Sequence, residues 1–181
     1  MCIRDRLNTK YLIAGAEANG VFENPQANGA AWIPTELTPV TTNQEEMDQL
    51  GTLNTKTQAT LNTAEFGQIP AGSGEIVLTS HSPDQLKYKA SMAKGGLAVF
   101  SEIYYPKGWT ATIDGQEAAI LRTNYLLRGL EIPAGEHEVV FSFAPSSYYS
   151  TKTPTVIFQY LILISLIAGV FFTYRKSHAN A

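Results

Sequence analysis

VIFQYLILISLIAGVFFTY occupies residues 156–174 of this chain and contains no Asp, Glu, Lys, Arg or Pro. Its few polar residues do not recur every three or four positions, as they would along the exposed face of a soluble helix. At about 1.5 Å per helical residue, the run matches the ~30 Å hydrocarbon core of a bilayer. Tyr160 and Tyr174 lie toward its two ends, where aromatic rings favour the headgroup level. The sequence therefore predicts a transmembrane helix over residues 156–174.

The charges that flank this run predict its orientation. Arg175 and Lys176 follow it directly, whereas Lys152 is the basic residue that lies close on the other side. An excess of Lys and Arg marks the cytoplasmic flank of a span. We therefore expect residues 175–181 to form a cytoplasmic tail and the residues ahead of the span to lie outside.

The composition limits the partners and the covalent chemistry. The net charge is −3 and the pI is about 5.6, so no basic face is available for a nucleic acid, and none is expected as a partner. Charged residues make up 16% of the chain, below the ~25% of ordinary soluble domains. The single cysteine, Cys2, excludes an internal disulfide. This composition suits an extracytoplasmic, β-rich domain.

The beginning of the sequence conflicts with an exported domain. Residues 1–6, MCIRDR, are charged and contain no apolar segment that would direct export. One interpretation is a stand-alone tail-anchored protein with a cytoplasmic domain and a structural or interaction role. The other is the C-terminal fragment of a longer membrane protein, with residues 1–6 as a non-native junction. We favour the fragment.

Residues 7–145 are predicted to form an antiparallel β-sandwich, followed by a polar linker over residues 146–155. From Gly74 onward apolar residues alternate with a period of two, and Asp114-Gly115 is a strong hairpin signal. The run at residues 97–105 is apolar on both faces, so we expect it to be a central strand. The other strands expected in this part are 75–80, 85–92, 109–113, 118–122, 125–132 and 136–143.

The first part of the domain is less regular. Short strands are expected at residues 11–13 and 21–22 around an Asn19-Gly20 turn, and again at 30–33 and 37–42, where Pro34 and Pro39 restrict the chain to edges or loops. A helix is predicted over residues 42–51, capped by Thr42 or Asn43. Its carboxylates fall in the first turns, where the helix dipole favours negative charge, and we expect no further role for them.

No motif in the sequence assigns catalytic, cofactor-binding or metal-binding residues. His81, His137 and His178 lie far apart, and no His or Cys pair has metal-ligand spacing. His137 shares an alternating face with apolar residues, so we expect a partly buried structural histidine. Glu102 lies among apolar residues in the central strand, and a structural ion pair with Arg122 or Arg128 is expected for it rather than catalysis.

Aromatic residues gather around one loop. Tyr104, Tyr105 and Trp109 lie close together, and Tyr125 is a further candidate. Exposed aromatic rings form platforms for sugar rings, so these four residues are candidate glycan contacts. The alternative is core packing, because Trp and Tyr bury large areas in any sandwich.

Several motifs resemble the C-terminal end of YfhO-type bacterial membrane proteins. They are LAVFSEIYYPKGW at 97–109, IDG at 113–115, RTNYLLR at 122–128, IPAGEH at 132–137 and FSF at 141–143, with weaker likeness in LNTKYLI at 7–13 and NGAAWI at 28–33. The resemblance implies a large polytopic protein whose β-rich domain is extracytoplasmic and whose last helix returns to the cytoplasm. It also implies similarity to glycosyltransferases that move a sugar from a polyprenyl-phosphate carrier to an envelope acceptor such as lipoteichoic acid.

The function expected from these observations is that of a non-catalytic part of such an enzyme. The resemblance implies an acidic catalytic residue in an early extracytoplasmic loop, which this chain does not include. The fragment would therefore hold or bind an envelope glycan, and any polyprenyl-phosphate-sugar would be bound elsewhere in the protein. The expected location is the bacterial cell membrane, with the lipid bilayer as a partner.

Overall fold

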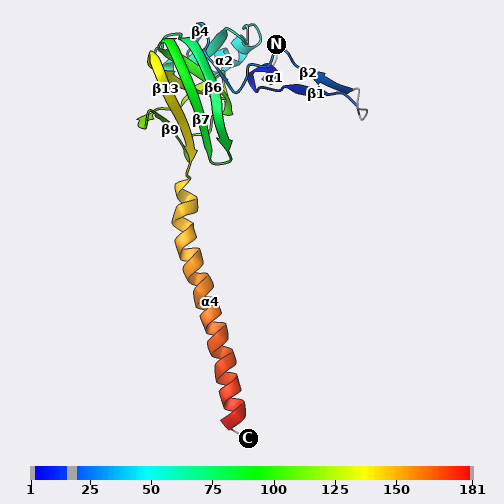
Figure 1. Ribbon diagram of the computed structural model, residues 1–181, viewed down its shortest axis with the longest axis vertical. Coiled ribbons are helices and arrows are strands. Elements are labelled where there is room, and N and C mark those ends of the chain that lie inside the picture. Colours follow the sequence, from blue (N-terminus) through cyan, green and yellow to red (C-terminus); the bar gives the residue numbers. More distant parts are fainter. Residues whose placement is uncertain (1–2, 16–19, 180–181) are drawn as a thin grey trace. The chain divides into compact units, whose positions relative to one another are not determined.

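The computed structural model describes residues 3–15 and 20–179. The chain divides into two compact units, Met1–Phe143 and Ala144–Ala181. The first is rich in β-strands and the second contains one long helix, α4 (Figure 1). The prediction of a mainly β domain followed by one apolar helix is confirmed.

The first sheet of the β-rich unit has five strands, and every neighbouring pair is antiparallel. In spatial order the strands are Gln116–Ala118 (β10), Trp109–Ile113 (β9), Gly135–Phe143 (β13), Gln85–Lys94 (β7) and Ser73–Ser82 (β6). The predicted turn at Asp114-Gly115 joins β9 to β10, and both residues have positive φ, 51° and 80°. A turn with two positive φ angles matches the twist of the flanking strands, and Asp-Gly adopts this conformation readily. This is why the Asp-Gly pair predicted the hairpin correctly.

The second sheet has six strands. In spatial order they are Ala31–Trp32 (β3), Gly96–Ile103 (β8), Leu127–Ile132 (β12), Leu121–Thr123 (β11), Gln58–Asn62 (β5) and Glu36–Val40 (β4). The two edges are β3 and β4, as predicted from Pro34, which follows β3, and Pro39, which lies in β4. β4 and β5 run parallel, while the other pairs are antiparallel. The helix between β4 and β5 supplies the crossover connection that parallel strands need.

The strand predicted at residues 118–122 is wrong as a single strand. β10 ends at Ala118 in the five-stranded sheet, and β11 begins at Leu121 in the six-stranded sheet. The intervening residues carry the chain from one sheet to the other. Periodicity cannot reveal such a crossing, because residues 118–121 are all apolar and show no alternation that could mark the change of sheet.

The core between the two sheets is formed by alternating residues of both. Tyr88, Phe100 and Phe141 are at most 1% exposed, and their rings meet edge to face with centroids 4.8–6.1 Å apart. Leu130 and Val139 are buried in the same cluster. This packing of one sheet against the other is the predicted sandwich.

The six-stranded sheet also buries its other face. A second cluster contains Trp32, Leu97, Val99 and Leu127, with Leu7 and other residues packed against it. Leu97 and Val99 thus face one cluster, while Ala98 and Phe100 face the other. The two-sided apolar pattern of residues 97–105 therefore predicted correctly a strand covered on both faces.

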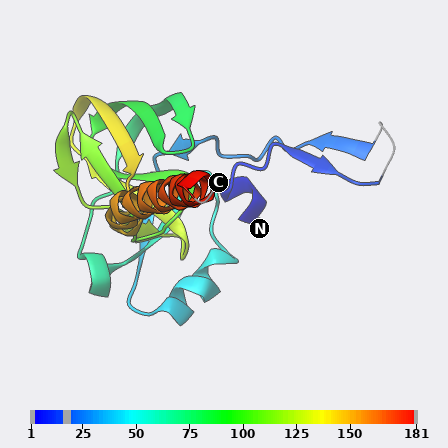
Figure 2. The ribbon, with the colours of Figure 1, turned by 90° about the horizontal axis from the view of Figure 1, so that it is seen from below.

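Three helices and a separate two-stranded ribbon complete the described part of this unit. The helix predicted at residues 42–51 is Asn43–Leu50 (α2), with Thr42 as its N-cap, and a short helix, Thr63–Phe66 (α3), follows β5. Tyr11–Ile13 (β1) and Val21–Glu23 (β2) form a two-stranded sheet of their own after the turn of helix Ile3–Arg6 (α1). Figure 2 shows this ribbon apart from the larger sheets. Asn19 of the predicted turn lies outside the described residues.

The second unit contains the helix Ser146–Ala179 (α4). The residues expected as a polar linker, 146–155, are helical and belong to it, with Pro154 inside the helix. Hydroxyl groups in this part bond to the helix itself, as Thr151 Oγ1 does to the carbonyl of Ser147 at 2.9 Å. Apolar residues such as Leu161 and Ile164 are more than half exposed. A membrane-spanning helix is expected to expose its apolar side chains in this way.

Candidate functional site

The carboxylate of Glu46 is fully enclosed in the β-rich unit, and the residue is 0% exposed. Its Oε1 accepts hydrogen bonds from Thr60 Oγ1 at 2.9 Å and from the backbone N–H of Tyr125 at 2.8 Å. Its Oε2 accepts from Arg122 Nη1 at 3.1 Å. The carboxylate on α2 is therefore bound to β5, to β11 and to the loop that follows β11.

Arg122 extends this network to the neighbouring helices. Its Nη2 donates to Asn43 Oδ1 at 2.8 Å and to Glu65 Oε2 at 3.1 Å, and its Nη1 also donates to the carbonyl of Tyr125 at 3.0 Å. Asn124 and Tyr125 in the loop have positive φ, 48° and 69°. Left-handed backbone is costly for Tyr, and the bonds from the Tyr125 backbone to Glu46 and Arg122 offset that cost.

This network corrects two predictions. Glu46 was assigned only a dipole interaction at the exposed start of its helix, but it is a buried ion-pair partner. The available signal was its place four residues before Leu50, which puts the two side chains on the same side of the helix. Glu102 was expected to pair with Arg122 or Arg128, and among the described residues it forms no ion pair within 4.0 Å. Burial lowers the pKa of Arg128, and the negative charge of Glu102 partly opposes that lowering from a distance.

The aromatic candidates separate into two places. Tyr104, Tyr105 and Trp109 line one pocket of about 200 Å³, together with Glu117. Tyr105 is 50% exposed, whereas Tyr104 and Trp109 are more deeply buried. The structure thus brings together three of the four residues, from the end of β8 and the start of β9.

Trp109 is also part of the packing at this end of the sandwich. The guanidinium of Arg128 lies 4.0 Å from the centroid of the indole, in cation–π geometry, and the Phe143 ring lies 5.1 Å away. Arg128 Nε donates to the carbonyl of Ile103 at 2.9 Å. One indole face is therefore covered, and the ring is held in a fixed position at the pocket.

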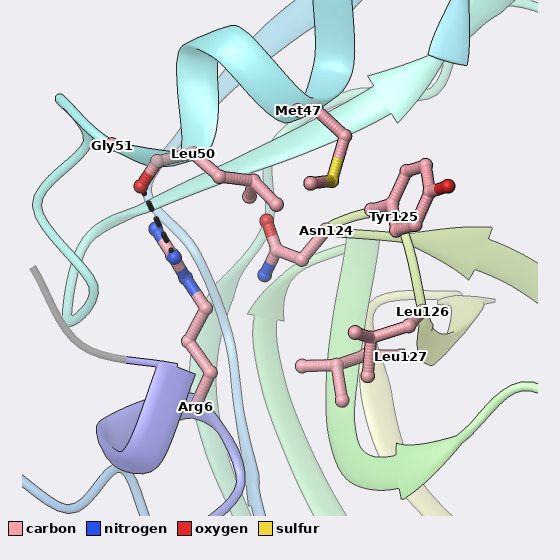
Figure 3. A pocket seen from close by; sticks show the side chains of 8 residues that line it. All are labelled: Arg6, Met47, Leu50, Gly51, Asn124, Tyr125, Leu126 and Leu127. Atoms are coloured by element: carbon pink, nitrogen blue, oxygen red, sulfur yellow. Dashed lines mark hydrogen bonds between the residues drawn. The ribbon is translucent and has the colours of Figure 1, made fainter. Parts of the chain in front are cut away.

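Tyr125, the fourth candidate, lines a different pocket of about 260 Å³ (Figure 3). Helix α2 contributes Met47 and Leu50, and Arg6 approaches from α1. Leu126 comes from the loop after β11, and Leu127 is the first residue of β12. The Tyr125 ring also lies near the Arg122 guanidinium, at 5.7 Å. Tyr125 therefore does not extend the platform formed by the other three aromatic residues.

His137 forms an ion pair with the hairpin turn. Its Nδ1 lies 2.6 Å from Asp114 Oδ2, and Asp114 Oδ1 accepts from the backbone N–H of Glu138 at 2.8 Å. The hydrogen bond to Asp114 raises the pKa of His137, and the bond to His137 lowers the pKa of Asp114. The His137 side chain is 15% exposed and that of Asp114 is 50% exposed. The pair ties the β9–β10 turn to β13.

The stabilisation from this pair is expected to depend on pH. Because the pKa of His137 is raised in the folded protein, its ion pair stabilises the fold fully at pH values below the unfolded pKa of 6.5. This stabilisation is lost as the pH rises through the folded pKa. Because the pKa of Asp114 is lowered, the stabilisation that its charged form provides is lost only as the pH falls below 3.8. Replacing His137→Gln should therefore lower the unfolding midpoint more at about pH 5 than at about pH 9. An equal drop in the unfolding midpoint at both pH values would contradict the ion pair.

Among the described residues no group of His, Cys, Asp and Glu is arranged to hold a metal ion. The β-rich unit is followed by a helix in which Ser146–Phe171 is long and apolar enough to cross a membrane, and this is the organisation of a membrane-anchored protein. The chain belongs to the YfhO family: the family model described as "Bacterial membrane protein YfhO" matches residues 44–175. No match was found among curated proteins or among solved structures.

Proposed function

We propose that this chain is the C-terminal part of a polytopic membrane protein and that its β-rich unit binds a cell-envelope glycan. In this proposal the unit lies outside the cytoplasmic membrane, α4 crosses the membrane, and the residues from Arg175 onward are cytoplasmic. Membership of a family of bacterial membrane proteins supports the bilayer association. The basic pair Arg175 and Lys176 after the span supports the orientation.

The glycan proposal rests on the pocket that Tyr104, Tyr105 and Trp109 line. Two tyrosines and a fixed indole offer apolar ring faces with hydroxyl groups beside them, which suits the mixed surface of a sugar. Glu117 in the same pocket supplies oxygen atoms that accept hydrogen bonds from sugar hydroxyls. A carboxylate here disfavours phosphate, so the proposed ligand is a neutral glycan segment rather than a phosphorylated lipid carrier.

In this proposal the unit binds glycan and performs no chemistry. Glu46 is fully enclosed, and both of its carboxylate oxygens already accept hydrogen bonds, so it cannot act as an acid or a base on a ligand. Sugar transfer from a polyprenyl-phosphate carrier, which likeness to membrane glycosyltransferases implies, would belong to another part of the protein. The unit would hold the acceptor glycan close to that reaction.

The binding is tested with the whole chain in lipid nanodiscs, titrated calorimetrically with neutral oligosaccharides such as N-acetylglucosamine and galactose oligomers. Tyr105→Ala should weaken binding by about tenfold or more, because a central aromatic contact contributes more than ~1 kcal/mol. Tyr11→Ala is the matched control, since Tyr11 is 62% exposed on the separate ribbon. If no oligosaccharide produced heat on titration, or if both variants lost the same amount of binding affinity, the proposed site would be contradicted.

A further inference from the structure

The pocket in Figure 3 combines apolar walls with one buried amide. Four apolar side chains line it, those of Met47, Leu50, Leu126 and Leu127. Asn124 is 1% exposed, and its Oδ1 accepts from the backbone N–H of Thr60 at 2.9 Å. That backbone group can only donate, so it fixes the orientation of the amide. The Nδ2 of Asn124 therefore lies toward the pocket, and it has no hydrogen-bond partner among the described residues.

The loop that carries this amide is held in place by the rest of the β-rich unit. The backbone of Asn124 and Tyr125 is left-handed, which is costly for residues other than glycine. The N–H of Asn124 donates to the carbonyl of Thr60 at 3.3 Å, and the N–H of Tyr125 donates to the buried carboxylate of Glu46 at 2.8 Å. Because these bonds order the loop in advance, a ligand does not bear that cost when it binds.

The amide and the walls together define the chemistry of an occupant. A buried N–H without an acceptor is unfavourable, so the occupant should supply an oxygen atom to Asn124 Nδ2. The walls require that the rest of the occupant be apolar. The pocket volume, about 260 Å³, is below the ~300–1,000 Å³ of sites for drug-sized ligands and above the ~150 Å³ of a cavity that holds benzene. One bulky apolar group with a carbonyl beside it therefore fits.

The exposed residues of the pocket favour a polypeptide as the source of that group. Met47 is 48% exposed and Tyr125 is 36% exposed, and both line the pocket. Arg6 lines it as well, where its Nη1 donates to the carbonyl of Leu50 at 3.3 Å. Methionine, tyrosine and arginine are enriched at protein interfaces, where a bulky side chain of one partner fills a pocket of the other. A polypeptide also carries a backbone carbonyl next to each apolar side chain.

We propose that this pocket is a docking site for a polypeptide partner, which inserts one bulky apolar side chain and gives a backbone carbonyl to Asn124 Nδ2. Leucine and phenylalanine have side chains of the required size. In this proposal α2 and the loop after β11 form a protein interface that is separate from the aromatic pocket of the proposed glycan site. The inference requires neither glycan binding nor the membrane orientation, so its failure is distinguishable from failure of the proposed function.

Methyl NMR of the whole chain in lipid nanodiscs, with ¹³C in the methionine methyl groups, tests the proposal. Met47 reports on the pocket, and Met92, which is 4% exposed in the core, is the internal control. The probes are blocked tripeptides with leucine, phenylalanine or glycine between two alanines. The leucine or the phenylalanine tripeptide should shift the Met47 signal to saturation and leave the Met92 signal in place, whereas the glycine tripeptide should shift neither.

Three outcomes of this titration would overturn the proposal. The first is the absence of a saturable Met47 shift with both the leucine and the phenylalanine tripeptides. The second is an equal shift with the glycine tripeptide, which would show that the apolar side chain is not recognised. The third is a saturable shift with methyl hexanoate and with none of the tripeptides, which would assign the pocket to a small acyl ligand instead.

Amide variants assign the binding to the buried donor. Asn124→Asp retains the oxygen that accepts from Thr60 and removes the free N–H, so it should weaken tripeptide binding by about fivefold or more. Asn54→Asp is the matched control, because Asn54 is exposed and its Oδ1 likewise accepts from a backbone N–H, that of Lys56, at 3.0 Å. An undiminished affinity in Asn124→Asp, or an equal loss in Asn54→Asp, would overturn the proposal.

A wall variant tests the same pocket without changing the amide. Leu50→Ala removes part of the apolar wall, so it should weaken tripeptide binding by about threefold or more. An unchanged Met92 signal shows for each variant that the core has kept its fold. Unchanged affinity in a folded Leu50→Ala variant would mean that the tripeptide binds elsewhere and would overturn the proposal.

Discussion

Replacing Glu46→Ala is expected to lower the free energy of unfolding of the β-rich unit by about 3–5 kcal/mol, the usual loss when one partner of a buried ion pair is removed. The substitution leaves Arg122 with only Glu65 as a charged partner, and Glu65 is about half exposed. It also removes the nearer of two acceptors for Thr60 Oγ1 and the acceptor for the backbone N–H of Tyr125. The left-handed loop at Asn124 and Tyr125 then loses one of the contacts that hold it.

The measurement is urea unfolding followed by tryptophan fluorescence. Trp32 and Trp109 are the tryptophans of the chain, and both lie in the β-rich unit. Glu45→Ala is the matched control, because Glu45 is the adjacent, exposed carboxylate and its contacts are with the local backbone and hydroxyl of Thr41. That variant should lose about 1 kcal/mol or less. Losses of the same size in the two variants would mean that the buried ion pair does not stabilise the unit.

The second large effect is expected in α4. Each arginine at the centre of a membrane helix costs about 2.5–3.5 kcal/mol, so Leu163→Arg combined with Ile167→Arg should release the chain from the membrane. Both residues are exposed, and the sequence of the helix contains no Asp or Glu that could pair with the new arginines. Fractionation after carbonate treatment measures the result, with the unsubstituted chain in the pellet and the variant in the supernatant.

The control adds the same charge outside the apolar run. Ser147→Arg combined with Ser150→Arg places two arginines in the polar first part of α4, where both serines are exposed. This variant should remain in the pellet, because arginine is tolerated at the interface. Release of both variants would show that charge alone causes extraction, and retention of both would contradict a span at residues 156–174.

The sequence predicted most successfully those features that depend on neighbouring residues. Alternation identified the buried faces of β7 and β13, and the Asp114-Gly115 turn was located because its backbone conformation is set by the two residues themselves. The two-sided pattern of β8 also predicted correctly its burial on both faces. These features arise within a few residues of one another, so a single sequence contains the signal for them.

Features that depend on distant residues were not predictable in the same way. Glu46 and Arg122 are 76 residues apart, and nothing in either segment identifies the other as its partner. The parallel pairing of β4 with β5 depends on how α2 returns the chain to the sheet. The division of the aromatic candidates, with Tyr125 in a separate pocket from Tyr105, likewise follows from where the loop after β11 lies.

The central claim is that α4 crosses the membrane with the β-rich unit outside, and labelling of single cysteines tests it most directly. Val77→Cys places a thiol on an exposed position of β6, and Ser177→Cys places one in the tail after the span. Each is introduced into the intact protein in its own bacterium, treated with a membrane-impermeant maleimide and compared with the unsubstituted parent. The account predicts that position 77 is labelled in spheroplasts and that position 177 is labelled only after permeabilisation. Labelling of position 177 in intact spheroplasts, or protection of position 77, would contradict it.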